Sequence, residues 1–308
     1  MGSFPLPALI ATLAVGLALV ASPVASESST PLRVVSFNLL HGGPSSGLWS
    51  DDGHLDERLR LVTRELSRLT PDIVALQESS ISRGRNVAAR LAGDLGLHWA
   101  HASATRRVSG LRPIDTLLVW AMNFEEGPAI LSRWPIVEQE IYDLPRCAKF
   151  YDPRVVLRAA VDSPGGRLQV YSTHLAHDAC QTRRLAEILR AHAGPLPALL
   201  MGDFNAPESA EWMQTLVREA GLVDAYRAAN REASGATVWQ RPGAPDPTVT
   251  RRVDYVFVVP GRQAATRVRD SRVVLSTPAQ LANGTTLWPS DHYGVLADVV
   301  VDAREARH

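Results

Sequence analysis

Several short stretches of this sequence end an apolar run in side chains that can bind a metal ion or transfer a proton. In Met201-Gly-Asp-Phe-Asn205, the polar residues Asp203 and Asn205 follow the apolar run Leu196–Met201, which predicts a buried strand. Because side chains alternate along a strand, Asp203 and Asn205 should point the same way. Similar polar residues end three other apolar runs, at Gln77-Glu78, Thr173-His174 and Ser290-Asp291-His292. Their recurrence favours a functional role for these residues over separate structural roles.

Each of these motifs, taken alone, also fits an ordinary structural role. An Asp-x-Asn sequence after a strand can cap the following helix, and Glu78 alone fits a surface charge. His174, His177 and Cys180 form a His-x-x-His-x-x-Cys run, which offers too few ligands for a structural zinc site. We therefore favour a catalytic role for His174. Gly202 removes a side chain where neighbouring atoms need to come close.

Oxygen donors dominate the set, and soft ligands are few. The donors at expected strand ends are Asn38, Glu78, Asp203, Asn205 and Asp291. Such a set suits Mg²⁺ or Mn²⁺ better than zinc. Asp254, near the start of the apolar strand Val253–Val259, is either a surface charge or a carboxylate that orients a histidine. A histidine oriented in this way can act as a general base, and His292 is the natural partner.

Composition sets wide limits on the protein class. The chain has 308 residues, of which 45% are hydrophobic, enough for one large core or two modest ones. The 32 basic and 32 acidic residues balance, so no basic field indicates nucleic acid binding. Local charged patches can still bind a polyanion within a neutral protein.

The N-terminal stretch predicts export. The run Leu6–Val24 is apolar and uncharged, and small residues occur at Ala21, Ala25 and Ser26. We expect a signal peptide over residues 1–26 and a secreted or periplasmic mature protein. The alternative is an uncleaved membrane anchor, because the apolar length approaches the ~20 residues that span a bilayer.

The two cysteines, Cys147 and Cys180, form an even pair in a chain expected to reach an oxidising compartment. A disulfide between them is therefore the expected state. Two buried free thiols are the alternative.

The pattern of apolar residues predicts an α+β fold. Amphipathic helices are expected at Leu55–Leu69, Asn86–Leu95, Cys180–His192 and Ala210–Ala220. Strands are expected at Leu32–Phe37, Ile73–Leu76, Trp99–Ala102, Leu117–Met122, Ala129–Ser132, Ile136–Leu144, Val155–Val161, Leu168–Ser172, Leu196–Met201, Val253–Val259, Val268–Leu275 and Val295–Val300. The glycine- and serine-rich stretch from His41 to Gly53 predicts a loop. About a dozen strands with interspersed helices predict two packed, mostly antiparallel sheets flanked by helices, in one domain over residues 32–301.

The ordered set of motifs resembles the endonuclease/exonuclease/phosphatase superfamily, which has the pancreatic-deoxyribonuclease-like fold. The matching stretches begin at Ser36, Asp72, Ala129, Thr173, Gly202, Arg252 and Ser290, and read SFNLLHG, DIVALQE, AILSRWPI, THL, GDFN, RVDY and SDH. The resemblance covers nearly the whole mature chain. It implies a four-layer α/β/β/α sandwich and Mg²⁺- or Mn²⁺-dependent hydrolysis of phosphoesters by water, with no organic cofactor.

The resemblance also implies roles for the metal-site residues. Glu78 corresponds to the main metal ligand, with Asn38 beside it and Asp291 as a second ligand or hydrogen-bond partner. His292 corresponds to the base or phosphate-binding histidine, paired with Asp254.

A second group of implied residues acts on the substrate. Asp203 and Asn205 correspond to the groups that orient the attacking water and bind the phosphoryl oxygens, with Asp203 as an alternative base to His292. His174 corresponds to the second active-site histidine, with Glu126 as its carboxylate partner. Arg154 corresponds to an arginine that contacts the phosphate together with Asn205 and His174.

Some positions depart from well-known branches of the superfamily. Leu40 stands where apurinic endonucleases have Asp, and Ser80 stands where deoxyribonucleases have an Arg for the minor groove. Both departures argue against specific DNA recognition. The sequence therefore predicts an exported, monomeric phosphodiesterase or phosphomonoesterase, with nucleic acid and phospholipid headgroups both open as substrates. The alternative is a non-catalytic relative that serves as a secreted binding module.

Overall fold

The structure is a computed structural model that describes residues 2, 31–41, 54–82, 84–146, 153–176, 179–238, 244–245 and 247–303. The predicted signal peptide, apart from Gly2, lies outside the described residues, and so do His177 and Cys147. Within the described part of the chain, no helix combines the length and the apolar character needed to cross a bilayer.

The first sheet carries the N-terminal strand near its centre. Its strands, in spatial order, are β12 (Ala264–Val274), β15 (Gly294–Ala303), β1 (Leu32–Asn38), β2 (Ile73–Ser82), β5 (Phe124–Ser132) and β4 (His98–His101), and β3 (Arg85–Asn86) pairs with β2. Only β1 and β2 run parallel among the described pairs of this sheet. The parallel pair brings the C-terminal ends of both strands to one edge.

The second sheet also contains one parallel pair of strands among antiparallel ones. Its strands, in spatial order, are β10 (Val223–Asp224), β11 (Asp254–Val259), β9 (Ala198–Asp203), β8 (Gly166–His174), β7 (Val155–Ser163) and β6 (Ile136–Asp143). Among its described pairs, β8 and β9 alone run parallel. A separate short hairpin pairs β13 (Ala279–Gln280) with β14 (Thr286–Leu287).

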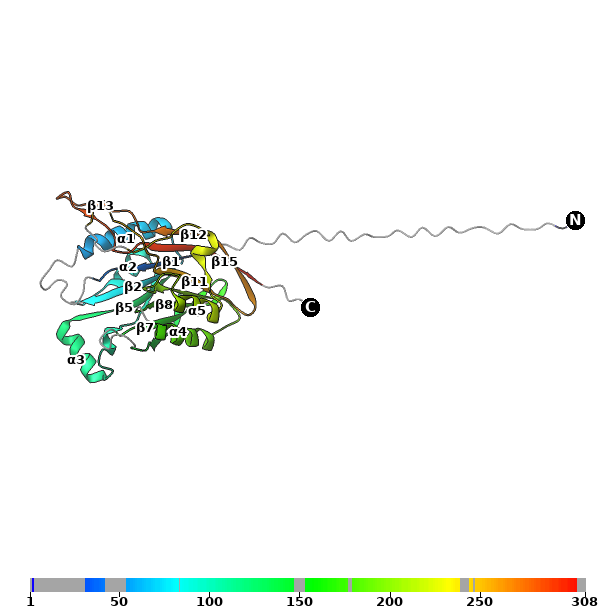
Figure 1. The fold of residues 1–308 in the computed structure, drawn as a ribbon, viewed down its shortest axis with the longest axis horizontal. Helices are drawn as coiled ribbons and strands as arrows, with labels where there is room; N and C mark the ends of the chain where they lie inside the picture. The colour runs from blue at the N-terminus through cyan, green and yellow to red at the C-terminus, as the bar shows by residue number, and fades with distance from the viewer. Residues whose placement is uncertain are drawn as a thin grey trace.

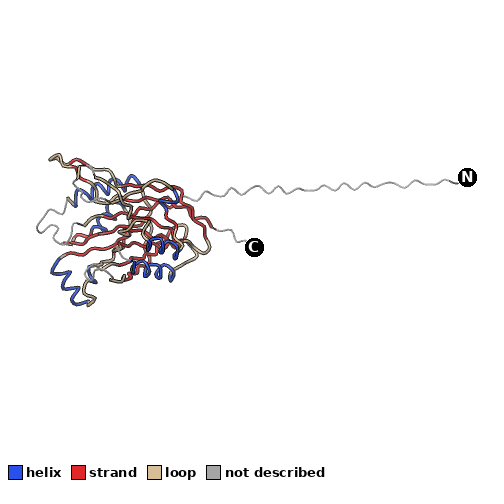
Figure 2. The backbone as a smooth tube through the Cα atoms, in the orientation of Figure 1, coloured by secondary structure: helices blue, strands red, loops and turns tan. Residues whose placement is uncertain are grey.

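The two sheets pack face to face, and helices cover their outer faces, as Figures 1 and 2 show. The described helices are α1 (Leu55–Leu69), α2 (Val87–Leu95), α3 (Arg112–Met122), α4 (Ala179–Ala191), α5 (Glu211–Ala220) and α6 (Ala225–Ala229), with a 3₁₀ turn η1 (Thr105–Arg107). Helices α1 and α2 pack on the first sheet, whereas α4 and α5 pack on the second. The predicted α/β/β/α sandwich is confirmed.

The alternation of apolar side chains explains why both sheets are buried on both faces. In β1, Val34 packs between the sheets, whereas Val35 and Phe37 pack outward against α1 and α2. In β9, Met201 faces the other sheet and Leu200 packs under α4 and α5. Burying apolar side chains on two faces is the main favourable contribution to such a fold, at roughly 25 cal/mol per Å². It also fixes the register, because a one-residue slip would exchange the two faces.

One expected element is wrong. The run Leu117–Met122 was expected as a strand, but it forms the C-terminal half of α3, which begins at Arg112 with Pro113 in its first turn. Only Asp115 and Val119 of this helix are buried, four residues apart on one face. Leu117 and Trp120 are instead exposed, at 61% and 77% of their surface. A short apolar run does not distinguish a buried strand from such a helix.

Gly202 has the close approach that the sequence predicts. A Cβ atom added there would lie 2.2 Å from the Thr173 carbonyl oxygen of the neighbouring strand β8. We expect Gly202→Ala to lower the free energy of unfolding by about 1–3 kcal/mol, the usual cost of forcing extra volume into a packed core. The matched control is Gly93→Ala in α2, where nothing lies within 4 Å of the added Cβ. That change should stabilise by about 0.5–1 kcal/mol. Urea denaturation measures both, and equal stability of Gly202→Ala and wild type would contradict the prediction.

The disulfide remains a prediction, because Cys180 lies in the first turn of α4 but Cys147 lies outside the described residues. Thiol titration of the unfolded, non-reduced mature protein should find almost no free thiol. Reduction before titration should expose both cysteines. Two reactive thiols without reduction would show that the cysteines are not bonded.

Candidate active site

The second sheet places three functional side chains in a row. Its register sets His174 of β8 opposite Asp203 of β9, and Asp203 opposite Asp254 of β11. All three are buried, at 9%, 1% and 0% exposure. The sequence predicted a shared site for these residues, and the strand pairing alone brings them together.

The first sheet supplies Asn38 and Glu78. Asn38 ends β1, and the pairing of β2 with β5 shifts register between Leu76 and Ser79. The irregularity is typical of a β-bulge, and Glu78 within it has a left-handed φ of 54°. A non-glycine residue in this conformation costs about 1–3 kcal/mol. The bulge re-aims the Glu78 carboxylate, and Asn38 Nδ2 donates a hydrogen bond to its Oε1 at 3.1 Å.

Asp203 is the centre of the site. Its Oδ2 accepts a hydrogen bond from Asn38 Nδ2 at 3.0 Å, and its Oδ1 accepts one from the Asn205 backbone N–H at 2.7 Å. The Nε2 atoms of His174 and His292 lie 3.4 and 3.7 Å from Oδ2. Burial, together with the negative charge of Asp254, raises the pKa of Asp203 to about 7. A carboxyl group with this pKa can accept a proton near neutral pH.

His292 is held by Asp254, as predicted. The His292 Nδ1 lies 2.8 Å from Asp254 Oδ2, and the Asp254 backbone N–H donates to Thr237 Oγ1 at 3.3 Å. Burial lowers the pKa of His292, but the charges of Asp254 and Asp203 outweigh it and raise the pKa to about 10. The ring is therefore an imidazolium at neutral pH, suited to binding an anion or donating a proton. Thr237 was not anticipated, and nothing in its local sequence indicates the role.

His174 has the opposite character. Burial lowers the pKa of His174 well below its usual value, and the positive charges of Arg154, His292 and His41 lower it further. The Asn205 amide nitrogen donates to the Leu175 carbonyl at 2.8 Å, which fixes the orientation of the amide. The same nitrogen lies 2.9 Å from His174 Nε2, so this ring nitrogen is the acceptor and Nδ1 carries the proton.

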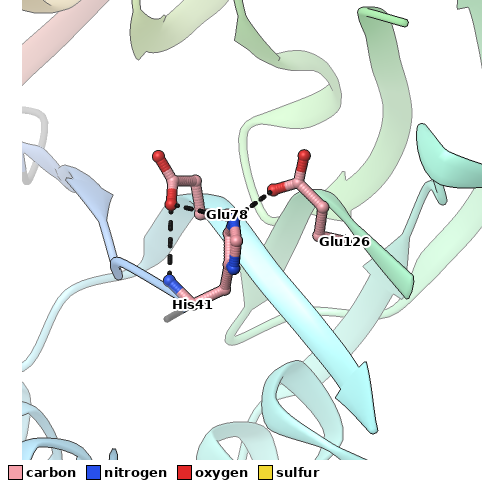
Figure 3. Close-up of side chains that lie close together, drawn as sticks. All are labelled: His41, Glu78 and Glu126. Atoms are coloured by element: carbon pink, nitrogen blue, oxygen red, sulfur yellow. Dashed lines mark hydrogen bonds and ion pairs between the residues drawn. The ribbon is translucent and has the colours of Figure 1, made fainter. Parts of the chain in front are cut away.

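His41 belongs to the site, although the sequence analysis placed it at the start of a loop. Its Nε2 lies 3.4 Å from Glu78 Oε2 and 3.5 Å from Glu126 Oε2. Figure 3 shows the His41 ring between the two carboxylates. The sequence shows only that His41 follows Asn38 by three residues; its approach to the carboxylates depends on the folded backbone, in which Leu40 has a φ of 52°.

The expected pairing of Glu126 with His174 is therefore not the arrangement in the structure. The carboxylates that contact the His174 ring belong to Asp203, at 3.4 Å, and Glu78, at 3.9 Å. Glu126 instead contacts His41, at 3.5 Å. The resemblance implied this role for Glu126 from its position before Gly127-Pro-Ala-Ile, whereas its contact with His41 depends on how the chain after β1 folds.

Arg58 supports the site from outside the sheets. Its side chain is 99% buried, since only 1% of the residue is exposed. The guanidinium donates to the carbonyls of Leu39 at 2.6 Å, Leu40 at 2.7 Å and Pro289 at 3.2 Å. It therefore joins the chain after β1 to the segment that leads into Ser290-Asp291-His292. An arginine on a helix is usually a surface residue, so the sequence did not indicate that Arg58 would join these two segments.

The residues predicted to hold a divalent cation fit that group. Burial raises the pKa of the Asp291 carboxyl; the positive charge of His292 opposes this effect and the negative charge of Glu78 adds to it. The carboxylates of Asp291 and Glu78 repel each other, and a cation bound by both would relieve that repulsion. Asn38 directs its amide N–H groups at Glu78 and Asp203, and its Oδ1 accepts from the Leu40 N–H at 3.0 Å. The second lone pair of that oxygen stays available to an ion, and an all-oxygen set suits Mg²⁺ or Mn²⁺.

The sequence belongs to the family that this site suggests. A model of the Endonuclease/Exonuclease/phosphatase family matches residues 35–292, which include the whole candidate site from Asn38 to His292. The chain is therefore a member of this family. A search of curated proteins gave no significant match.

Solved structures share the fold. An endonuclease/exonuclease/phosphatase family protein from Bacteroides thetaiotaomicron has a TM-score of 0.67 and 20% identity, over 90% of this chain and 99% of that one. A mannosyl-6-phosphatase from the same organism has a TM-score of 0.65 and 20% identity, over 87% and 99% of the two chains. D. rerio TDP2 complexed with single strand DNA product has a TM-score of 0.62 and 18% identity, over 87% and 98%.

The charge state of His292 can be measured directly. In metal-free protein, we expect its ring to stay protonated at pH 8, because its pKa is raised to about 10. This pKa lies above the unfolded value of 6.5, so the pairing of His292 with Asp254 contributes its full stabilisation of the fold below pH 6.5. The stabilisation is lost as the pH rises through about 10.

Histidine ring NMR against pH is the measurement. Asp254→Asn should lower the pKa of His292 by about 1–3, the usual effect of one neighbouring charge. Asp94→Asn, an exposed carboxylate in α2, is the control and should leave the His292 titration unchanged. A neutral His292 ring at pH 8 in the wild type would contradict the prediction.

Proposed function

We propose that this protein is an exported, metal-dependent phosphoesterase that cleaves a phosphodiester or phosphomonoester bond by attack of water. The observation that carries the proposal is the arrangement around Asp203. Asn38 from one sheet, and His174 and His292 from the other sheet and the loop before β15, approach the same buried carboxylate oxygen within 3.0–3.7 Å. A binding module has no need for two histidines of opposite character around one carboxylate.

The side chains divide the work of hydrolysis by their charge states. Glu78 and Asp291 would hold a divalent cation, whose positive charge would polarise a phosphoryl oxygen. Asp203, with a pKa of about 7, accepts the proton of the attacking water. The imidazolium of His292, oriented by Asp254, offers positive charge to the phosphoryl group. His174 is held neutral, and Arg154 adds its positive charge beside it.

Of the two candidate bases, this arrangement favours Asp203 over His292. The His292 ring has a carboxylate at each nitrogen, at 2.8 Å from Nδ1 and 3.7 Å from Nε2, and both favour the protonated ring. A ring that already carries its proton cannot take one from water. Asp203 is only 1% exposed, and burial makes its carboxylate a stronger base.

Two observations bear on the class of substrate. Among the structural neighbours, one is a mannosyl-6-phosphatase and one is D. rerio TDP2 complexed with single strand DNA product. The departures at Leu40 and Ser80 argue against specific DNA recognition here. Nucleic acid, phospholipid headgroups and sugar phosphates are therefore the substrates to test.

The test is hydrolysis by the mature protein with Mg²⁺, with Mn²⁺ and with chelator. The panel comprises plasmid DNA, single-stranded DNA, RNA, sphingomyelin, a hexose 6-phosphate and simple mono- and diesters. We expect chelator to abolish turnover, and Glu78→Ala, Asp203→Asn and His292→Ala each to lower kcat by about 10²–10⁴-fold. Glu232→Gln, an exposed glutamate, is the matched control.

The outcomes separate the alternatives. Turnover that survives chelator, or full activity of Asp203→Asn, would contradict the mechanism. No turnover together with no Mg²⁺-dependent rise in Tm would favour the non-catalytic binding module. If DNA or RNA is cleaved, substrate affinity should fall steeply with salt, because phosphate contacts release counterions.

A further inference from the structure

His41, Glu78 and Glu126 form a cluster that the proposed mechanism does not use as a unit. The three residues come from separate segments, the chain after β1, the bulge in β2 and the start of β5. Their side chains are 17–19% exposed, so solvent and ions can reach them. One nitrogen and two carboxylate oxygens, one from each residue, lie within 4.8 Å of one another.

The spacing is that of ligands around an ion. The His41 Nε2 lies 3.4 Å from Glu78 Oε2 and 3.5 Å from Glu126 Oε2. Figure 3 marks both contacts with dashed lines. A direct charge-assisted hydrogen bond would be shorter, at about 2.7–2.9 Å. Ligand atoms at about 2.1 Å from a tetrahedral Zn²⁺ are separated by about 3.4 Å, which follows from the tetrahedral angle. Two of the three separations therefore match those around one such ion, and the third is at most 4.8 Å.

The surrounding contacts hold the cluster in this geometry. The His41 ring packs on Phe124 with its centroid 5.1 Å away, and the His41 backbone N–H donates to Glu78 Oε2 at 3.3 Å. On the other side of the carboxylate, Glu78 Oε1 accepts from Asn38 at 3.1 Å. The two oxygens of Glu78 therefore face different partners, and this carboxylate can bridge two ions.

We propose that His41, Glu78 and Glu126 bind a second cation, a borderline transition-metal ion such as Zn²⁺ or Mn²⁺. An imidazole with two carboxylates suits such ions, whereas Mg²⁺ prefers oxygen ligands alone. Three protein ligands leave a fourth position open to water or an anion. The site shares Glu78 with the ion of the proposed function, but its occupation does not depend on hydrolysis.

The experiment is Zn²⁺ binding to the metal-free mature protein, measured by equilibrium dialysis and calorimetry. His41→Ala and Glu126→Gln should each bind one Zn²⁺ fewer than the wild type. The controls are His98→Ala and Glu232→Gln, which change an exposed histidine and an exposed glutamate elsewhere, and both should bind as the wild type does. Asp291→Asn should retain the Zn²⁺ equivalent that His41→Ala loses.

A second readout reports the ligands themselves. Four-coordinate Co²⁺ absorbs visible light strongly, so Co²⁺ added to the wild type should give a band that His41→Ala reduces and His98→Ala keeps. Glu126→Gln preserves side-chain shape and serves as the test variant if His41→Ala does not fold. Equal Zn²⁺ stoichiometry in the wild type and in folded ligand variants would overturn the proposal. If the wild type binds this Zn²⁺ but hydrolyses none of the substrates, the result would count against the proposed function alone.

Discussion

A buried carboxylate has to be surrounded by hydrogen-bond donors and positive charge, and the rest of this structure depends on meeting that requirement at Asp203. Its donors come from β1 and from the chain that follows β9, and the His292 ring supplies positive charge at 3.7 Å. Both sheets must therefore pack in one relative position. Gln77 and Ser172 help to set it, because Gln77 Nε2 donates to Ser172 Oγ and that hydroxyl donates across the interface to the Leu76 carbonyl, at 3.4 and 3.1 Å.

The same carboxylate separates the two histidines chemically. His292 has Asp254 behind it and Asp203 before it, and its pKa rises to about 10. His174 receives an amide N–H at Nε2 and positive charges nearby, and its pKa falls. Two identical side chains at one centre thus become a stable cation and a stable neutral ring. Pairs of groups whose pKa values are pushed apart are a recurring property of acid–base sites.

Much of the candidate site could be predicted from the sequence, because an apolar run that ends in polar residues is a local sequence pattern. The row of His174, Asp203 and Asp254 follows from strand register, and Glu78 is marked by the apolar run before it. The site residues that were missed are not marked by such a pattern. The role of His41 depends on a turn and on a carboxylate from β5, whereas that of Arg58 depends on carbonyl groups brought together only by folding. Helix α3 was missed because its exposed apolar residues resemble a core strand.

Arg58 has a consequence for how this chain tolerates change. Outer helices of a sandwich usually act as interchangeable covers, and substitutions there alter stability without touching chemistry. Here Arg58 in α1 donates hydrogen bonds to the carbonyls of Leu39, Leu40 and Pro289, next to residues of the candidate site. The covering helix and the candidate site are therefore structurally coupled. Recombining this helix layer with a foreign sandwich, in evolution or in chimera design, would require the arginine and both loops to travel together.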